Sequence, residues 1–405
     1  MLTSDRVIVI YDFGDINGGA AQVAIGSALE LRLRGKTVDY FCAVGPINSQ
    51  LIEAGINVTC LGQADILRAK SRLGAAMSGI WNFEAARQLE ALLASADKEN
   101  TVIHVHGWSK ALSVSIFPVI ERLGFRLVVT AHDYFLACPN GGFFNYQTSE
   151  VCKLKPLSAS CLLSSCDVRR YSHKLWRHVR QSVGAHTHAG PLTLKNIIYI
   201  SELSRSVLEK HINPNAKWHF VSNPILGDPR PRVRAEDNST YIFIGRISKE
   251  KGCADFCSAM TRLGLNGVVV GDGPLLAELQ TAWPNVKFMG WQDRNGVDDV
   301  ISKARALVFC SLWYETQGLV VQEAMSRGIP ALVADHTAAR ESVSSGINGM
   351  LYTRADAESL DRGLVALTDN LLVAHLSEGA YSTYWSNPPT LKAHVDALLG
   401  VYAAI

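Results

Sequence analysis

The chain has 405 residues, of which 48% are hydrophobic and 19% charged, as is typical of a globular protein. This length predicts two domains, because a single hydrophobic core seldom grows beyond about 250 to 300 residues. With 39 Lys or Arg against 37 Asp or Glu, the formal charge of +2 is too small to indicate a nucleic-acid-binding protein.

The sequence shows neither a signal peptide nor a membrane span. Residues 1–6 lead directly into a strand-like run, and no apolar run is long enough to cross a bilayer. Nine cysteines in such a chain favour a reducing compartment, so we expect a cytoplasmic protein.

In the first half, strand-like runs alternate with helical periodicity. The first strand, 6–11, leads into a glycine-rich loop containing Gly18 and Gly19, and a helix is predicted over 20–33. Further strands are predicted at 37–41, 58–61, 101–105, 126–130 and 197–200, with helices at 83–96 and 112–123. The alternation predicts a doubly wound parallel sheet. Paired glycines let a backbone approach a phosphate, although they also make plain turns; the G-x-G-x-x-G pattern of nicotinamide dehydrogenases is absent.

Polar residues follow two of these strands. His106 comes after the strand at 101–105, and His132 and Asp133 come after the strand at 126–130. Ligands of open α/β sheets bind at the carboxyl ends of the strands, so we expect these side chains at the edge where the Gly18-Gly19 loop lies. A structural role for each histidine is the alternative.

A cysteine-rich insertion at about 134–167 interrupts the pattern. Its four cysteines are Cys138, Cys152, Cys161 and Cys166. Four thiolates can bind zinc and so fold a loop, but the spacing is not paired C-x-x-C, and free buried cysteines or a disulfide are the alternatives. Its position next to His132 makes the insertion a candidate lid over an acceptor.

The stretch 169–180 is basic, with interleaved aromatic residues. One interpretation is a solvated helix face. The other is a helix that rests on an anionic membrane or a lipid pyrophosphate, with Trp176 at the interface and Arg177 and Arg180 in contact with the lipid.

The second half begins after a Pro- and Arg-rich linker, 225–237. A strand at 241–244 runs into a tight loop in which Arg246 and Lys251 are placed to hold one diphosphate. Strands at 267–271 and 286–289 also end in turns, and the first of these contains Gly273. These turns are predicted to line a nucleobase-binding site. The alternative is that their glycines only make turns.

The segment 309–333 reads as strand end, loop, helix and strand. Gly318 and Leu319 open the helix, whose first N–H groups and dipole suit a phosphate. Glu315 in the loop and Glu323 in the helix are placed to accept hydrogen bonds from sugar hydroxyls on either side of that phosphate. This arrangement fits a nucleotide-sugar, whereas two solvated glutamates on a surface loop are the alternative.

Together these motifs resemble the retaining GT-B glycosyltransferases of family 4 (glycosyl transferases group 1), over nearly the whole chain. The resemblance rests on Gly18-Gly19-Ala20, His104-Val105-His106, His132-Asp133, Ser222-Asn223-Pro224, Gly245-Arg246 with Lys251-Gly252, Gly271-Asp272-Gly273-Pro274, and Glu315 with Glu323 before Gly328-Ile329-Pro330. It implies two Rossmann-like domains facing across a cleft: an acceptor domain at 1–224, a nucleotide-sugar domain at 238–381, and a C-terminal helix at 382–405 that crosses back to the first domain.

The resemblance also implies residue roles. Arg246 and Lys251 would hold the donor diphosphate, and Glu315 the donor sugar, with Gln317 standing where the family usually has phenylalanine. The amides of Gly318 and Leu319 would meet phosphate or sugar oxygens, Glu323 would bind the ribose, and Gly19 would reach the diphosphate from the first domain. His106 would line the donor sugar near the reacting carbon, with His132 and Asp133 on the acceptor side.

We therefore expect a retaining transfer from a UDP- or GDP-linked sugar to a glycan or lipid-linked acceptor, in cell-surface polysaccharide biosynthesis. The expected place is the cytoplasm, at the inner face of the membrane, with peripheral membrane association. No metal is required for this chemistry, because the two cations do the work of a divalent ion. The alternatives are a nucleotide-sugar epimerase or sugar-phosphate synthase on the same scaffold, and a non-catalytic nucleotide-sugar-binding protein.

Overall fold

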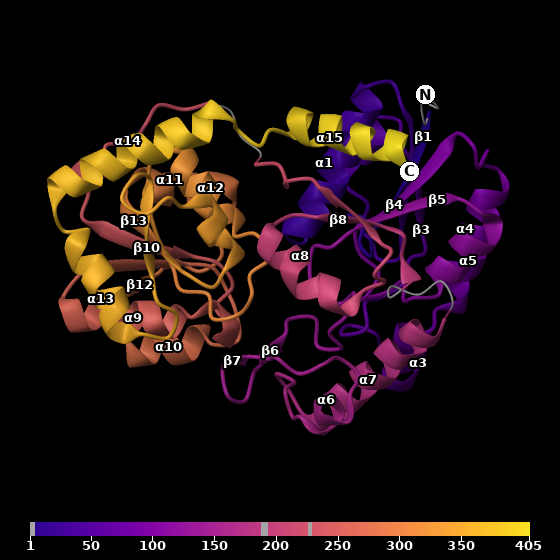
Figure 1. Cartoon of the computed structure of the whole chain (residues 1–405), viewed down its shortest axis with the longest axis horizontal. Coiled ribbons are helices and arrows are strands. Elements are labelled where there is room, and N and C mark those ends of the chain that lie inside the picture. The colour runs from indigo at the N-terminus through magenta and orange to yellow at the C-terminus, as the bar shows by residue number, and fades with distance from the viewer. Residues whose placement is uncertain (1–4, 188–192, 226–228) are drawn as a thin grey trace.

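The computed structural model describes residues 5–187, 193–225 and 229–405. Two parallel sheets flanked by helices form two domains that lie side by side (Figure 1). The expected α/β architecture of two doubly wound parallel-sheet domains is thus confirmed. Within the described residues, no helix is both long enough and apolar enough to cross a membrane.

The first sheet has the order β3-β2-β1-β4-β5-β8-β9. Its strands are β1 (Arg6–Ile10), β2 (Thr37–Cys42), β3 (Asn57–Cys60), β4 (Thr101–Val105), β5 (Arg126–Thr130), β8 (Asn196–Tyr199) and β9 (Lys217–Phe220). The domain's helices are α1 (Gly19–Leu33), α2 (Ser49–Glu53), α3 (Arg72–Ile80), α4 (Phe83–Ala94), α5 (Ile116–Leu123), α6 (Ala159–Leu163), α7 (Tyr171–His186) and α8 (Glu202–Leu208). The central strands β1 and β4 are buried on both faces, which is why they read as continuous apolar runs.

The second sheet has the order β12-β11-β10-β13-β14-β15. Its strands are β10 (Thr240–Ile244), β11 (Asn266–Val270), β12 (Lys287–Phe288), β13 (Ala304–Phe309), β14 (Ala331–Ala334) and β15 (Gly349–Tyr352). Its helices are α9 (Cys253–Leu263), α10 (Leu276–Ala282), α11 (Arg294–Ser302), α12 (Leu319–Ser326), α13 (Ala357–Ala366) and α14 (Asn370–Ser386).

In both sheets the strand order reverses at one point, between β1 and β4 in the first and between β10 and β13 in the second. Loops that leave such a switch point diverge to opposite faces of the sheet and leave a crevice at the strands' carboxyl ends, where α/β proteins bind ligands. The glycine-rich loop follows β1, the Arg246 loop follows β10, and the Glu315 loop follows β13. The topology therefore places the predicted donor residues at the two switch points.

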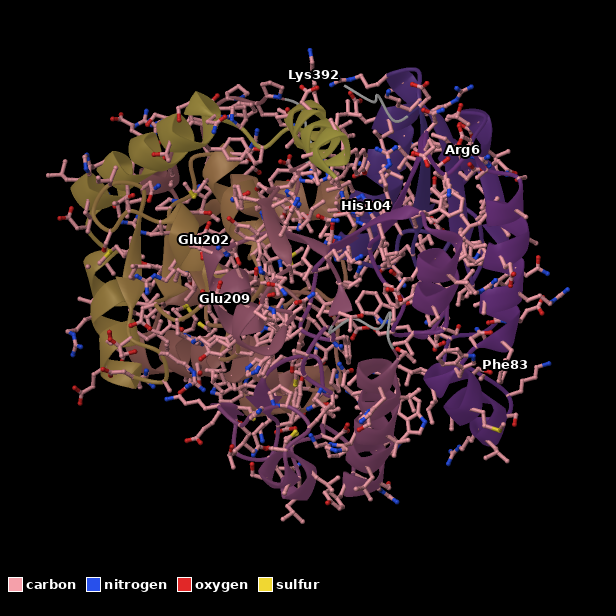
Figure 2. The ribbon with its side chains drawn as sticks, turned by 45° about the vertical axis from the view of Figure 1, so that its right-hand side comes forward. Arg6, Phe83, His104, Glu202, Glu209 and Lys392 are labelled. Carbon is pink, nitrogen blue, oxygen red and sulfur yellow. The ribbon has the colours of Figure 1, made fainter. Side chains whose placement is uncertain are left out.

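The last helix, α15 (Leu391–Ala404), packs on α1 of the first domain (Figure 1). Figure 2 shows His104 beneath this helix, and the His104 Nδ1 lies 2.7 Å from the Tyr402 hydroxyl. His394 joins Ser27 and the Ser222 carbonyl at 3.1 and 2.7 Å. The crossing itself lies at 387–390, because α14 stays on the second domain up to Ser386.

The connection between the domains is more structured than a free linker. Three of the residues expected there, 226–228, lie outside the described residues. Val233 donates its amide to the Arg327 carbonyl, and Arg232 bonds Ser377 on α14 at 2.8 Å. The second half of the expected linker is thus part of the second domain's surface.

The cysteine-rich insertion was expected as a long loop, and this is wrong in part. It contains a short hairpin, β6 (Phe144–Asn145) and β7 (Glu150–Val151), followed by α6. The hairpin reaches the second domain, where Lys249 donates to the Tyr146 carbonyl at 2.8 Å and Arg354 to the Ser149 carbonyl at 3.1 Å.

The basic stretch 169–180 is helical from Tyr171 on, and its cations differ: Arg169 and Arg170 are exposed, whereas Lys174 is buried. Contact of this stretch with a membrane stays a prediction, but two of the residues expected to carry it lie elsewhere. Arg180 is buried, and Arg177 pairs with the buried Asp167 at 3.0 Å. Trp176 does not face a lipid interface, because it packs against Gly79 of α3 and donates to the Ala76 carbonyl at 3.0 Å. Some polar side chains of α7 point inward because they find buried acceptors there: Asp167 for Arg177, the Ser109 carbonyl for Arg180 and the Ala76 carbonyl for Trp176.

Candidate active site

An ion pair joins two loops of the second domain. Lys251 Nζ, from the loop after β10, lies 2.6 Å from Glu315 Oε2, from the loop after β13. Ser311 and Trp313 also donate to that oxygen, at 3.0 and 3.1 Å. Burial raises the pKa of Glu315, but Lys251, Trp313 and Ser311 together bring the pKa below its ordinary value. Glu315 is therefore a buried carboxylate held in its charged form.

Backbone packing fixes the distance between these loops. Gly252 has a φ of +68°, and a Cβ there would lie 2.0 Å from the Cys310 carbonyl oxygen. Only glycine permits both the left-handed backbone and this approach. Arg246, in the same loop, is exposed, and its guanidinium forms no hydrogen bond or ion pair with the described residues. Lys251 gives one of its N–H groups to Glu315 and keeps the others, so an anion shared by Arg246 and Lys251 stays a prediction.

The amino end of α12 faces the glycine-rich loop of the first domain. Gly318 has a φ of +82°, and no side chain caps the helix. A Cβ built on Gly19 would lie 3.4 Å from the Leu319 side chain. The amides that open α12 therefore lie across a narrow gap from Gly18 and Gly19, and helix N–H groups of this kind bind anions.

Two further donor-side residues lie near this helix. Glu323 is half-buried, and burial raises its pKa while Arg294 opposes the rise. Gln317 bridges the domains, since its Nε2 donates to Ser222 Oγ at 3.2 Å, while its buried Oε1 has no partner among the described residues. Gly273 packs directly on the Ile247 carbonyl, where a Cβ would lie 2.2 Å away, so packing alone explains the glycine.

The predicted histidines meet at the edge of the first sheet. His106 Nδ1 lies 3.0 Å from His132 Nε2, and the His132 carbonyl accepts from Thr316 of the second domain at 3.0 Å. Burial lowers the pKa of both histidines, that of His132 to about 3, so both imidazoles are neutral at physiological pH. The other ring nitrogen of His106, Nε2, is buried without a described partner, which suits a ligand-facing atom.

Two aspartates sit beside these histidines. Burial raises the pKa of Asp133 to about 6, partly opposed by the Phe135 amide, Lys110 and Arg180. Asp12, which the sequence prediction missed, accepts the amides of Lys110, Ala111 and Leu112 at 2.9, 2.8 and 2.9 Å. Its position directly after β1 was the available signal. Asp12 ties the glycine-rich loop to the loop after β4.

The four cysteines of the insertion line one small cavity together with Lys174. The buried Lys174 ammonium lies 3.3 Å from Cys161 Sγ, and all nine cysteines are free. No three His, Cys, Asp or Glu side chains within the described ranges are placed to hold a metal ion. Zinc at these cysteines stays a prediction.

Known proteins resemble the chain in both sequence and fold. Residues 228–382 match the family described as Glycosyl transferases group 1. The UDP-Gal:alpha-D-GlcNAc-diphosphoundecaprenol alpha-1,3-galactosyltransferase of Escherichia coli is 26% identical over 199 residues, 45% of this chain and 51% of that protein. A GDP-mannose-dependent alpha-mannosyltransferase of Mycolicibacterium smegmatis is 29% identical over 193 residues, 47% of this chain and 48% of that protein. The matches thus span about half the length of these curated relatives.

Among solved structures, Anabaena HepE in complex with UDP and glucose matches with a TM-score of 0.65 and 16% identity, over 99% of this chain and 100% of that chain. At this identity the match shows the fold. The chain therefore has the GT-B fold, and its second domain's match to Glycosyl transferases group 1 supports a GT-B glycosyltransferase.

Proposed function

We propose that the chain is a retaining glycosyltransferase that moves a sugar from a UDP- or GDP-linked donor to a glycan or lipid-linked acceptor in cell-surface polysaccharide biosynthesis. The observation that carries the proposal is the convergence at the two switch points: the Gly19 loop faces the amino end of α12, beside the Lys251–Glu315 pair. The two relatives, named for UDP-galactose and GDP-mannose as donors, support a nucleotide-sugar donor.

Charge determines the chemistry. Breaking the anomeric C–O bond leaves negative charge on the departing diphosphate, so preorganised donors around it stabilise the transition state. In this proposal the stabilisation comes from Arg246, the remaining N–H groups of Lys251 and the first amides of α12, which have no side-chain cap. Glu315 is a charged acceptor for donor-sugar hydroxyls. In a same-face attack, a diphosphate oxygen takes the proton of the acceptor hydroxyl, and the sugar keeps its anomeric configuration.

Nucleoside diphosphate release from a panel of UDP- and GDP-sugars tests the proposal. We expect release with one donor, stimulated by an acceptor, and a loss of roughly a hundredfold or more in Arg246→Ala. Arg262→Ala, which removes a surface arginine paired with Asp361, is the control. Binding without release would favour the non-catalytic alternative. Turnover that needs no glycan or lipid acceptor and yields a new free sugar or sugar phosphate would favour the epimerase or synthase.

Peripheral association with an anionic membrane is the second part of the proposal. Eight of the 18 exposed large hydrophobic side chains among the described residues lie in 65–82 and 153–186: Leu67, Leu73, Met77, Leu163, Val168, Tyr171, Leu175 and Val179. The same two segments hold ten Lys or Arg and two Asp. Exposed apolar residues among cations favour an anionic bilayer surface. In Figure 1 the helices concerned, α3, α6 and α7, lie together at one end of the first domain.

Sedimentation with vesicles that contain anionic lipid tests this part. Leu73→Ser with Met77→Ser is expected to reduce the bound fraction several-fold, because both side chains are exposed on α3. Val365→Ser with Leu371→Ser removes two exposed apolar residues from the second domain and is the control. Equal sedimentation of both double variants and the unchanged chain contradicts a membrane contact at α3.

A further inference from the structure

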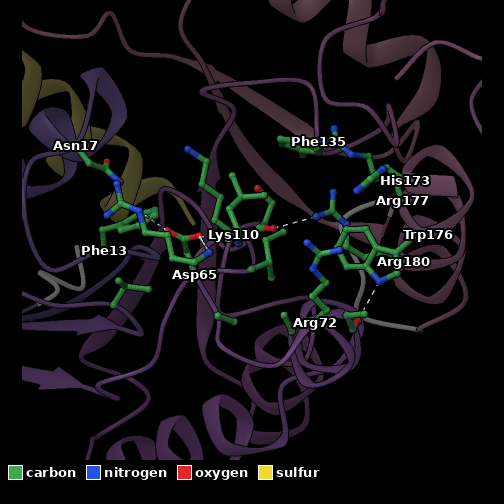
Figure 3. Close-up of a pocket in the computed structure, with 18 of the residues that line it drawn as sticks. Phe13, Asn17, Asp65, Arg72, Lys110, Phe135, His173, Trp176, Arg177 and Arg180 are labelled. Carbon is green, nitrogen blue, oxygen red and sulfur yellow. Dashed lines mark hydrogen bonds and ion pairs between the residues drawn. The ribbon is translucent and has the colours of Figure 1, made fainter. Parts of the chain in front are cut away.

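The first domain holds an open pocket of about 1210 Å³ that is separate from the Lys251–Glu315 site. Its walls are the loops after β1, β2 and β4, Phe135 after β5, the segment 65–76, and residues from 169 to 180 at and before α7 (Figure 3). The second domain contributes no described residue. A pocket of this size accommodates a drug-sized ligand.

Two strongly basic segments, 65–82 and 153–186, contribute to the pocket. Both acidic residues of 65–82 and 153–186 are buried and already bonded: Asp65 accepts the amides of Leu67 and Arg68, and Asp167 pairs with Arg177. The exposed formal charges of these two segments are therefore all positive, although the whole chain carries only +2. Such a local field attracts anions.

Three cations that line the pocket have no carboxylate partner in the described part of the chain. Arg180 is 6% exposed and donates to the neutral Ser109 carbonyl at 2.9 Å. Lys110 lies over the Phe13 ring at 5.7 Å, and Arg72 makes no hydrogen bond or ion pair within the described ranges. Figure 3 shows these three side chains directed toward the space between Asn17 and Trp176. Asp12 and Asp133 act on Arg180 only at a distance, so an anion in the pocket would be its first direct charged partner.

Aromatic rings form part of the same walls. Arg180 is stacked between Phe135 and Trp176, with its guanidinium carbon 5.0 and 5.2 Å from their ring centroids. Trp176 is locked in place, because a Cβ on Gly79 would lie 2.7 Å from its ring. Rigid aromatic rings beside cations suit a ligand that carries both an apolar ring face and a negative charge.

We propose that this pocket binds a phosphate or diphosphate group carried by the acceptor, with Arg72, Lys110 and Arg180 as its ligands. The inference rests on the proposed function and names the acceptor's chemical class. The pocket reaches Asn17, which adjoins Gly18 and Gly19 opposite the amino end of α12. An acceptor held by its phosphate there has the rest of its glycan beside the donor site.

The experiment measures binding of inorganic pyrophosphate to the full chain by calorimetry, with Arg246→Ala as the background so that the donor clamp contributes little. We expect Arg72→Gln with Lys110→Gln to weaken binding at least about tenfold, since each charge-assisted contact to phosphate is strong. Both side chains are exposed, so the substitutions leave the core intact. Arg87→Gln with Arg122→Gln removes the same charge from α4 and α5, neither of which lines the pocket, and is expected to change binding less than twofold.

Two results would contradict the proposed phosphate site. One is that the Arg246→Ala chain binds no pyrophosphate, and the other is that both double variants lose pyrophosphate affinity equally. Neither bears on the proposed function, which is tested by donor-dependent nucleotide release and its loss in Arg246→Ala. The source of the phosphate is read from two further probes, farnesyl diphosphate and glucose 1-phosphate. Tighter, Arg72-dependent binding of farnesyl diphosphate assigns a lipid-linked acceptor, and tighter binding of glucose 1-phosphate assigns a water-soluble phosphorylated one.

Discussion

Lys251 and Glu315 lie 64 positions apart in the sequence, yet their side chains meet at 2.6 Å. They come from the loops after β10 and β13, the two strands that flank the switch point of the second sheet. The pair fixes the position of the lysine ammonium and keeps the glutamate charged. One contact therefore positions both the cation and the acceptor group of the proposed donor site.

Glu315→Gln is expected to lower transfer by about a hundredfold, because the amide neither pairs with Lys251 nor accepts as strongly from a sugar hydroxyl. Steady-state kinetics with the identified donor measure this loss, and Glu278→Gln on the exposed α10 is the control. We also expect the free energy of unfolding at pH 7 to fall by about 1 to 3 kcal/mol, because the half-buried ammonium of Lys251 loses its charged partner.

The stability difference between the unchanged chain and Glu315→Gln is expected to shrink as the pH falls. The folded pKa of Glu315 is lowered, so the ionised carboxylate contributes stability above its unfolded pKa, and this contribution is lost as pH falls through the folded pKa. Urea unfolding at pH 7 and at pH 3 is therefore expected to show a smaller gap between the two chains at pH 3. A gap that widens in acid contradicts the assignment of the ion pair.

Gly252→Ala is expected to cost at least about 2 kcal/mol, because its Cβ overlaps the Cys310 carbonyl in addition to straining the backbone. Gly35→Ala is the matched control, since Gly35 has a φ of +79° with nothing within 4 Å of its Cβ, and is expected to cost about 1 kcal/mol. The difference between the two free energies of unfolding in urea measures the cost of the contact between the new Cβ and the Cys310 carbonyl. Equal costs would mean that the two loops are not locked together at this point.

Asp133→Asn is expected to stabilise the folded chain at pH 8 by about 1 to 3 kcal/mol. Burial raises the pKa of Asp133 to about 6, so the folded state holds its proton more tightly and loses stability as pH rises from the unfolded pKa through about 6. At pH 5 the wild-type residue is mostly protonated, and the advantage of asparagine is expected to shrink. Thermal unfolding at both pH values checks this, and a larger advantage at pH 5 is the contrary outcome. A simultaneous fall in transfer would mark Asp133 as an acceptor-side residue.

Chelation by EDTA is expected to leave the transfer rate unchanged, because Arg246, Lys251 and the α12 amides carry the positive potential at the diphosphate. A loss of rate that Mg²⁺ or Mn²⁺ restores contradicts this expectation. Zinc analysis of the same sample, repeated on Cys152→Ser, tests the predicted cysteine site separately. Stoichiometric zinc that falls in the variant supports that site.

The strands at the centre of each sheet were predicted most closely. The expected strands 101–105 and 126–130 coincide with β4 and β5, because a strand buried on both faces is apolar throughout. No strand was predicted at β9, an edge strand with two exposed ends and two half-buried central residues. The predicted helix after Glu315 is α12, shorter by a residue at each end.

The site was predictable only where a motif is local. Gly318 and Leu319 open α12 as expected, because the signal lies within a few residues. The inward turn of α7 was not predictable, because periodicity places charged residues outside. Lys174 and Arg180 are buried for reasons that lie elsewhere in the chain, the sulfur of Cys161 and the carbonyl of Ser109. The phosphate pocket depends on such long-range contacts.

The position of α15 has a consequence for how the protein is made. Tyr402 and His394 complete the packing of β4 and α1, because they contact His104 and Ser27, which lie 298 and 367 positions earlier in the chain. Until synthesis reaches α15, this flank of the first domain leaves apolar side chains uncovered, so the first domain consolidates only after the second has been made.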